Sequence, residues 1–228
     1  KVKCYASGGS ISMDNNQIEN EIDLILKKNF MAYKMRVGFD TWDKDLKRLK
    51  SAKLKLGDKG LMVDSIMGTI SPSWSLSEAK KKIKDLSEFN PIWLEEPLHP
   101  SKIDEYSKLK NKKIPIAAGE AYSGFFEFDY LINNNSVDVL QFDCTHSGGI
   151  EICKKIAEKS KNKNIKNSIH VWGSPLALSS NLHLALSLED LMFFEVPQIG
   201  DLALGGIVFY VDSTGQHGLV AAPQDLFN

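Results

Sequence analysis

One stretch of the chain, residues 91–120, reads PIWLEEPLHPSKIDEYSKLKNKKIPIAAGE. It contains two short apolar runs, PIWLEEP (91–97) and IPIAAGE (114–120), which are separated by a polar segment. Short apolar runs bounded by turn residues are typical of strands that are buried on both faces, and such strands form parallel sheets when helices alternate with them. The stretch therefore predicts two neighbouring parallel strands, each followed by a carboxylate.

The same alternation of short apolar runs with more polar segments continues along the chain, with apolar runs at 2–8, 31–38, 60–66, 137–143, 167–171 and 191–196. Amphipathic segments lie between them. In residues 77–89, for example, Ala79, Ile83 and Leu86 recur at helical spacing and Ser77 is a candidate N-cap. Eight such units predict an α/β fold in which a parallel sheet closes into a barrel covered by helices. A doubly wound open sheet is the alternative.

Composition narrows the class of protein. The 228 residues carry 28 basic and 29 acidic side chains, which leaves no net field for nucleic acid or an anionic membrane. No apolar stretch approaches the roughly 20 residues that span a bilayer, and the first residues lack the apolar core of a signal peptide. Three cysteines are too few for a disulfide framework. We therefore expect a cytoplasmic protein that binds neither membrane nor nucleic acid.

Ionisable residues mark the end of nearly every predicted strand. In a parallel barrel these ends meet at one rim, where barrel enzymes build their active sites. Unpaired buried charge is costly, so packing alone does not explain such a ring; capping of the next helix by each carboxylate is the alternative. The ring consists of Lys34, Arg36, Asp64, Glu95, Glu120, Asp143, His170 and Glu195.

Three of these residues, Asp64, Glu95 and Glu120, fall on consecutive strands. Their carboxylates can converge on one point and supply hard oxygen donors, without the cysteine or histidine ligands that zinc favours. This set predicts a Mg²⁺ site that leaves coordination positions for water and a substrate carboxylate.

The remaining polar residues suggest acid–base chemistry. Asp143 and His170 lie on the next two strands, where the aspartate can orient the imidazole and raise its basicity, so His170 is the candidate general base. Lys34 and Arg36 are two residues apart on one strand and therefore share a face.

At these residues the chain resembles the enolase superfamily, specifically the mandelate racemase/muconate lactonizing enzyme group. The resemblance covers about residues 1–200 and rests on motifs that occur in the family's order: YASGG (5–9), YKMRVG (33–38), VDSI (63–66), WLEEP (93–97), AAGEAYSG (117–124), FDCTHSGGIEICKKIA (142–157), SIHVWGSPLALSSNLHLAL (168–186) and FFEVP (193–197). It implies a modified TIM barrel of the (β/α)7β type.

The resemblance also implies roles for the site residues. Asp64, Glu95 and Glu120 match the family's Mg²⁺ ligands, and Asp143 and His170 match its His-Asp dyad. Removal of a proton next to a carboxylate produces an enediolate, which Mg²⁺ and Lys34 would stabilise. Glu195 matches a glutamate near the substrate carboxylate and, if protonated, would donate a hydrogen bond to this intermediate.

Several features depart from the family pattern. Arg36 replaces the usual second lysine, and arginine is a poor base, so a one-base reaction at His170 is favoured. Ile66 stands where an asparagine is common. The usual N-terminal α+β capping domain is not expected in this chain. Residues 201–228 do not resemble a barrel ending and are expected to form an unassigned tail after a barrel domain of residues 1–200.

The sequence therefore predicts a Mg²⁺-dependent enzyme that acts on a small-molecule carboxylate, namely an acid-sugar dehydratase that uses His170. A racemase or epimerase of the same group is the first alternative, with Lys34 as the second base. A catalytically impaired fragment is the other alternative. We expect a homo-oligomer.

Overall fold

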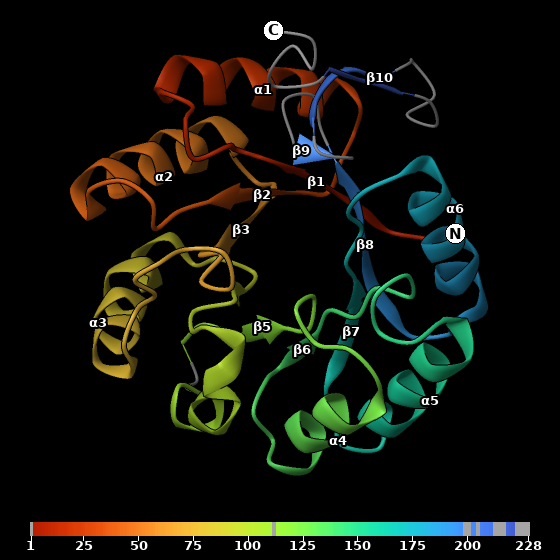
Figure 1. The fold of residues 1–228 in the computed structure, drawn as a ribbon. Helices are drawn as coiled ribbons and strands as arrows, with labels where there is room; N and C mark the ends of the chain where they lie inside the picture. The colour runs from red at the N-terminus through yellow and green to blue at the C-terminus, as the bar shows by residue number, and fades with distance from the viewer. Residues whose placement is uncertain (1, 111–112, 198–201, 204–205, 212–217, 222–228) are drawn as a thin grey trace, which may run out of the picture.

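The computed structural model describes residues 2–110, 113–197, 202–203, 206–211 and 218–221. Eight parallel strands form a closed barrel in sequence order, and the last strand pairs with the first (Figure 1). These strands are β1 (Cys4–Gly8), β2 (Ala32–Arg36), β3 (Gly60–Asp64), β4 (Leu94–Glu95), β5 (Ile116–Ala118), β6 (Val139–Leu140), β7 (Lys166–Ile169) and β8 (Leu191–Pro197).

A helical segment connects each strand of the barrel to the next, and these segments cover the outer face of the barrel (Figure 1). The helices are α1 (Asn15–Lys27), α2 (Trp42–Leu56), α3 (Leu76–Leu86), α4 (Phe125–Asn133), α5 (Ile150–Lys161) and α6 (Pro175–Ser187), with the 3₁₀ segments η1 (Ser87–Phe89) and η2 (Pro100–Lys108). The connection from β4 to β5 is η2 rather than an α-helix. This arrangement confirms the predicted modified TIM barrel of the (β/α)7β type.

The predicted strands are all present, but β4 and β6 contain only two residues each. β4 contains only Leu94 and Glu95, whereas the apolar run extends over residues 91–97. Pro91 and Pro97 bracket that run, and proline has no backbone N–H for the ladder, which limits the strand at both ends.

The start of α3 corrects the predicted N-cap. The cap is Ser75 rather than Ser77, because Ser75 and Glu78 form a capping box in which each side chain accepts a hydrogen bond from the other residue's backbone N–H. Ser77 lies inside the helix. The amphipathic face was predicted correctly, since Ala79, Ile83 and Leu86 are buried.

The interior of the barrel changes character along the strands. Its floor is a cluster of inward-facing side chains: Tyr5, Ala32, Met62, Trp93, Ala117, Val139 and Phe193. Side chains two residues apart on a strand point to the same face. The next inward layer is polar or charged and also buried: Ser7, Lys34, Asp64, Glu95, Gln141 and Glu195. The barrel therefore places ionisable groups directly above an apolar floor.

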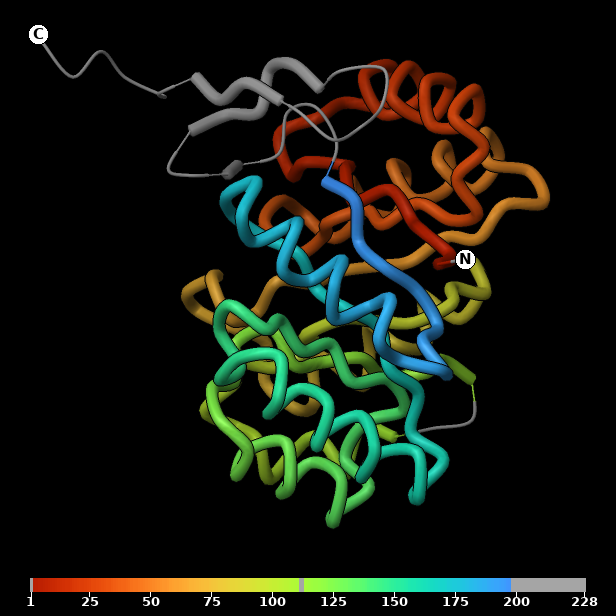
Figure 2. The backbone as a smooth tube through the Cα atoms, turned by 90° about the vertical axis from the view of Figure 1, so that its right-hand side faces the viewer, coloured from red at the N-terminus to blue at the C-terminus, as the bar shows by residue number. Residues whose placement is uncertain are grey.

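Viewed from the side, β8 passes along the N-terminal segment with which it pairs (Figure 2). Beyond the barrel, β9 (Leu202–Ala203), β10 (Gly206–Val211) and β11 (Gly218–Ala221) form a three-stranded antiparallel sheet. The boundary at residue 200 stays a prediction. Within the described part of the chain, none of the helices has the length and apolar character needed to cross a membrane.

Gly119 offers a test of strand packing. It has a φ of 153°, and a Cβ there would lie 2.6 Å from the backbone oxygen of Gln141, which directly follows the neighbouring strand β6. We expect Gly119→Ala to lower the free energy of unfolding by about 3 kcal/mol, measured by urea denaturation. Gly57→Ala is the control, since a Cβ added at Gly57 would meet no atom within 4 Å; it should show only the backbone strain of a positive φ, about 1 to 2 kcal/mol. Equal losses in both variants would contradict the packing argument.

Candidate active site

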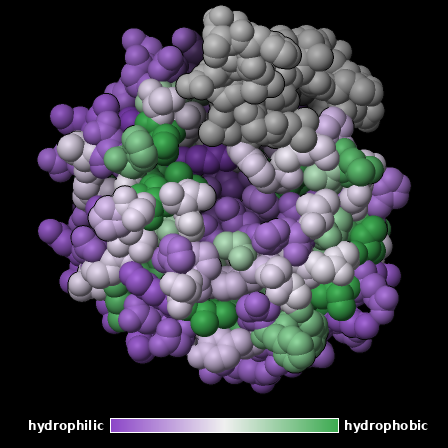
Figure 3. Space-filling model, viewed as in Figure 1, coloured by the Kyte–Doolittle hydropathy of each residue, from purple (hydrophilic) through white to green (hydrophobic). Residues whose placement is uncertain are grey.

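A cavity of about 560 Å³ opens at the carboxyl ends of the strands. In the space-filling view, hydrophilic side chains gather in the hollow at the centre of this face (Figure 3). The cavity is lined by Ser10, Ile11, Lys34, Arg36, Asp64, Ile66, Thr69, Glu120, Asp143, Thr145, His146, His170 and Trp172. Six of the eight predicted residues are in this lining, and the other two, Glu95 and Glu195, are buried.

The three predicted metal ligands converge. One carboxylate oxygen each from Asp64, Glu95 and Glu120 lies within 4.8 Å of the others. Asp64 and Glu95 are register partners on adjacent strands, which brings their side chains together. Glu96, a neighbouring carboxylate, is 1% exposed, and its Oε1 has no hydrogen-bond partner among the described residues. An excess of buried oxygen donors, one of them orphaned, fits a hard divalent cation such as Mg²⁺.

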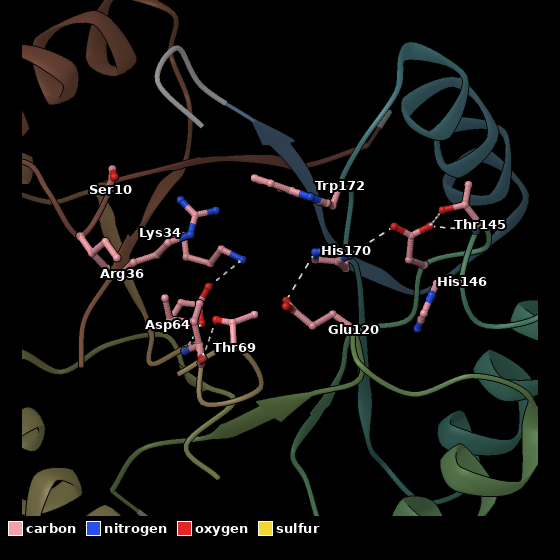
Figure 4. A pocket seen from close by; sticks show the side chains of 13 residues that line it. Ser10, Lys34, Arg36, Asp64, Thr69, Glu120, Thr145, His146, His170 and Trp172 are labelled. Carbon is pink, nitrogen blue, oxygen red and sulfur yellow. Dashed lines mark hydrogen bonds and ion pairs between the residues drawn. The ribbon is translucent and has the colours of Figure 1, made fainter. Parts of the chain in front are cut away.

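Lys34 lies against the same carboxylates from inside the barrel. Its Nζ is 2.7 Å from Glu95 Oε1, 2.8 Å from Glu195 Oε1 and 3.5 Å from Asp64 Oδ2. Burial alone would lower the pKa of Lys34, but attraction to Glu195 and Glu95 raises it well above its usual value. The amine is therefore held as an ammonium group that points toward the cavity (Figure 4).

Burial raises the pKa of Glu95 to about 8, assisted by repulsion from Asp64 and Glu120 and opposed by Lys34. The ionised form of Glu95 is thus destabilised when no cation is bound near these carboxylates. A bound cation would relieve this repulsion, which is a second physical reason for metal binding here.

Glu195 lies close to two positively charged groups. Burial alone would raise its pKa, but attraction to Lys34 and His170 lowers it to about 2. Its Oε2 accepts a hydrogen bond of 3.1 Å from the backbone N–H of Val171. Glu195 is therefore paired with Lys34, at 2.8 Å, and a hydrogen bond donated by its protonated form stays a prediction.

Asp143 and His170 form the predicted pair, with 3.2 Å between Asp143 Oδ2 and His170 Nδ1. The other ring nitrogen, Nε2, is 3.4 Å from Glu120 Oε2 (Figure 4). Burial would lower the pKa of His170, but Glu120, Glu195 and the hydrogen bond to Asp143 raise it to about 10. The imidazole thus lies between an orienting aspartate and the carboxylate cluster, with Nε2 on the cluster side.

Arg36 lies beside the cavity but is engaged by the protein. Its Nη1 donates to the carbonyl oxygen of Gly8 at 2.9 Å, and its guanidinium lies 5.9 Å from the ring centroid of Trp172. The buried Arg48 supports the same region, because its Nη2 donates to the carbonyl oxygen of Ser10 at 2.6 Å and its Nη1 donates to Asp45 Oδ1 at 2.9 Å. Arg48 thereby fixes the loop that follows β1.

Sequence reasoning did not identify several residues of the site. Glu96 follows a predicted ligand directly, so the doubled acid at 95–96 was a usable signal. Thr145 lies two residues after Asp143 and donates to its carboxylate through both N and Oγ1. Ser10, Ile11 and Thr69 lie in loops whose paths no periodicity reveals.

A comparison of the sequence with models of known protein families shows which family the chain belongs to. Residues 17–226 match the family described as enolase C-terminal domain-like. The chain belongs to this family. Within the enolase superfamily it is a member of the mandelate racemase/muconate lactonizing enzyme group, as the sequence motifs predicted.

Three relatives show what this enolase-superfamily chain is similar to. An L-talarate/galactarate dehydratase of Salmonella typhimurium is 30% identical over 187 residues, which cover 81% of this chain and 44% of the relative. The structure of the 3,6-anhydro-D-galactonate cycloisomerase from Zobellia galactanivorans superposes with a TM-score of 0.78 at 30% identity, covering 88% of this chain and 55% of that one.

The third relative is an L-talarate/galactarate dehydratase variant solved with Mg and L-glucarate, with a TM-score of 0.74 at 27% identity; 87% of this chain and 48% of that chain are covered. The chain therefore spans about half the length of the relatives that it matches.

The low pKa of Asp143 predicts a stability effect at acid pH. Burial alone would raise this pKa, but hydrogen bonds from His170, Asn181 and Thr145 lower it from 3.8 to about 2. A lowered carboxyl pKa stabilises the fold above the unfolded value and loses this effect as the pH falls toward the folded value. The difference in free energy of unfolding between the natural chain and Asp143→Asn should therefore shrink by about 2 kcal/mol between about pH 5 and pH 2. Urea denaturation across this range measures it, and a constant difference would contradict the assignment.

Proposed function

We propose that this chain provides the catalytic barrel of a Mg²⁺-dependent enzyme that removes the proton next to the carboxylate of an acid sugar and expels the β-hydroxyl, an acid-sugar dehydratase. The observation that carries the proposal is the placement of one oriented histidine beside three converging carboxylates and a buried lysine. The relatives named as dehydratases support this reaction class.

Asp64, Glu95 and Glu120 would hold the metal. Glu96 is buried beside them, where burial and repulsion from Glu120, Asp64 and Glu95 raise its pKa well above the usual value. When bound, Mg²⁺ would supply positive charge that compensates these carboxylates and polarises the substrate carboxylate. Lys34 presents its ammonium group to the same place and stabilises the negative charge that develops there when the α-proton leaves.

A cation bound by Glu120 and its neighbours would weaken the attraction that raises the pKa of His170, and the neutral imidazole would then take the α-proton at Nε2, since Nδ1 is occupied by Asp143 at 3.2 Å. The same imidazolium then lies where it can protonate the departing hydroxyl, so that one histidine serves both steps. Arg36 keeps its proton far above neutral pH and is not a second base; it contributes positive charge and hydrogen bonds at the cavity wall.

Racemisation or epimerisation needs a base on the opposite face of the substrate, for which Lys34 is the candidate. The ion pairs from Lys34 Nζ to Glu95, at 2.7 Å, and to Glu195, at 2.8 Å, favour a charged amine instead. The dehydratase is therefore the proposal that we prefer. The cytoplasmic location and the homo-oligomer stay predictions.

Metal binding can be measured without turnover. Glu120→Gln removes one anionic ligand and should weaken Mg²⁺ binding by about tenfold or more in titration calorimetry. Glu158→Gln, on the exposed face of α5, is the matched control and should leave the affinity unchanged. Unchanged Mg²⁺ affinity in both Glu95→Gln and Glu120→Gln would contradict the metal site.

The base is tested by exchange of the substrate α-proton with deuterated water. His170→Asn should fold and bind Mg²⁺ yet lose this exchange, because no other oriented base is expected at the site. His183→Asn, on the exposed part of α6, is the control and should exchange normally. Exchange that persists in His170→Asn but disappears in Lys34→Met would reassign the base and favour the epimerase. Mg²⁺ binding without any exchange by the natural chain would favour the impaired fragment.

A further inference from the structure

Asn181, on α6, contacts the dyad aspartate from outside the cavity. Its side chain is fully buried, and its Nδ2 donates to Asp143 Oδ1 at 2.7 Å. The residue does not line the cavity. No local sequence pattern links the two residues, because they lie on different elements of the barrel.

The orientation of the Asn181 amide is determined by two further hydrogen bonds. The backbone N–H of Cys144 donates to Asn181 Oδ1 at 2.9 Å, and Nδ2 also donates to the carbonyl oxygen of Ala177 at 3.1 Å. A flipped amide would place its NH₂ group against the N–H of Cys144 and its oxygen against two acceptors, Ala177 O and Asp143 Oδ1. Buried polar groups left without partners are costly, so the observed orientation, with a donor toward Asp143, is strongly preferred.

The Asp143 carboxylate is consequently held on one side. Its Oδ1 accepts hydrogen bonds from Asn181 Nδ2, from Thr145 N at 2.9 Å and from Thr145 Oγ1 at 2.6 Å. Its Oδ2 faces His170 Nδ1 at 3.2 Å. Rotation of the carboxylate away from the imidazole would break the bonds to Oδ1, so these donors orient Oδ2.

We propose that Asn181 is a positioning residue for the His-Asp dyad, which orients Asp143 so that its Oδ2 aligns the imidazole of His170. An effect of Asn181 on catalysis rests on the function proposed above. The orientation of Asp143 and His170 by Asn181 does not depend on that function, because the hydrogen-bond chain from Asn181 through Asp143 to His170 can be tested by itself.

A purely structural role is the competing explanation, since Asn181 also connects α6 to the segment that follows β6, through Asp143 and Cys144. Ser174→Ala separates the two roles. Ser174 is the N-cap of α6 and accepts a hydrogen bond of 3.2 Å from the backbone N–H of Ala177, so its loss loosens the same helix without a direct contact to Asp143.

The direct test is NMR of the chain labelled with ¹⁵N-histidine. The Nδ1–H of His170, when it is held by Asp143, should give a protected, downfield proton resonance, which is assigned by its absence in His170→Asn. We expect Asn181→Leu, which has a similar volume, to lose this resonance and Ser174→Ala to keep it. Asn181→Ala is the second variant, because its small side chain cannot clash; circular dichroism confirms folding. Persistence of the resonance in folded Asn181→Leu or Asn181→Ala, or its loss in Ser174→Ala, would overturn the proposal.

Exchange of the substrate α-proton separates this proposal from the proposed function. If both hold, Asn181→Leu lowers kcat by about tenfold or more with little change in KM, since the residue does not touch the cavity. If the natural chain shows no exchange while Asn181→Leu loses the NMR resonance, the proposed function fails and the positioning role stands. If exchange and resonance both survive in Asn181→Leu, only the positioning role is contradicted.

Discussion

The ammonium group of Lys34 lies in the interior of the barrel, 2.7 Å from Glu95, 2.8 Å from Glu195 and 3.5 Å from Asp64. An isolated buried charge of either sign costs several kcal/mol, so each member of this cluster depends on the others. Glu120 and the buried Glu96 lie beside them, and burial together with repulsion from Glu120, Asp64 and Glu95 raises the pKa of Glu96 well above its usual value, so the lysine alone does not compensate these acids. The same electrostatic constraint thus stabilises the core and creates the affinity for a cation.

The apolar floor determines where this cluster lies. Tyr5, Trp93 and Phe193 pack edge to face inside the barrel and exclude water from below. Trp93 also donates from Nε1 to Glu95 Oε2 at 2.9 Å, so the floor orients one of the candidate metal ligands. Because inward-facing residues repeat every second position, the change from aromatic floor to charged layer occurs at one level around the barrel.

Helices on the outside of the barrel contribute to the site as well as to the core. Arg48, from α2, fixes the loop after β1 through the carbonyl oxygen of Ser10, and Asn181, from α6, holds Asp143. Both residues are buried and neither lines the cavity. Two kinds of element therefore determine the geometry of the rim. The strands carry the reactive side chains, and the helices restrict the orientation of those side chains and of the loops beside them.

The sequence by itself determined the order of the strands, favoured the barrel over an open sheet and identified most of the ring, because short apolar runs and one acid or base per βα unit are local properties of the chain. Residues such as Asp64, Glu120 and His170 could be predicted since each lies at or just after the end of its own strand. Only the tertiary structure decided that Glu195 contacts Lys34, that Ser75 rather than Ser77 caps α3, and that Asn181 holds Asp143. Ionisation and side-chain orientation in a buried site depend on distances of a few ångströms between segments far apart in the chain, and the pattern of one segment contains no information about those distances.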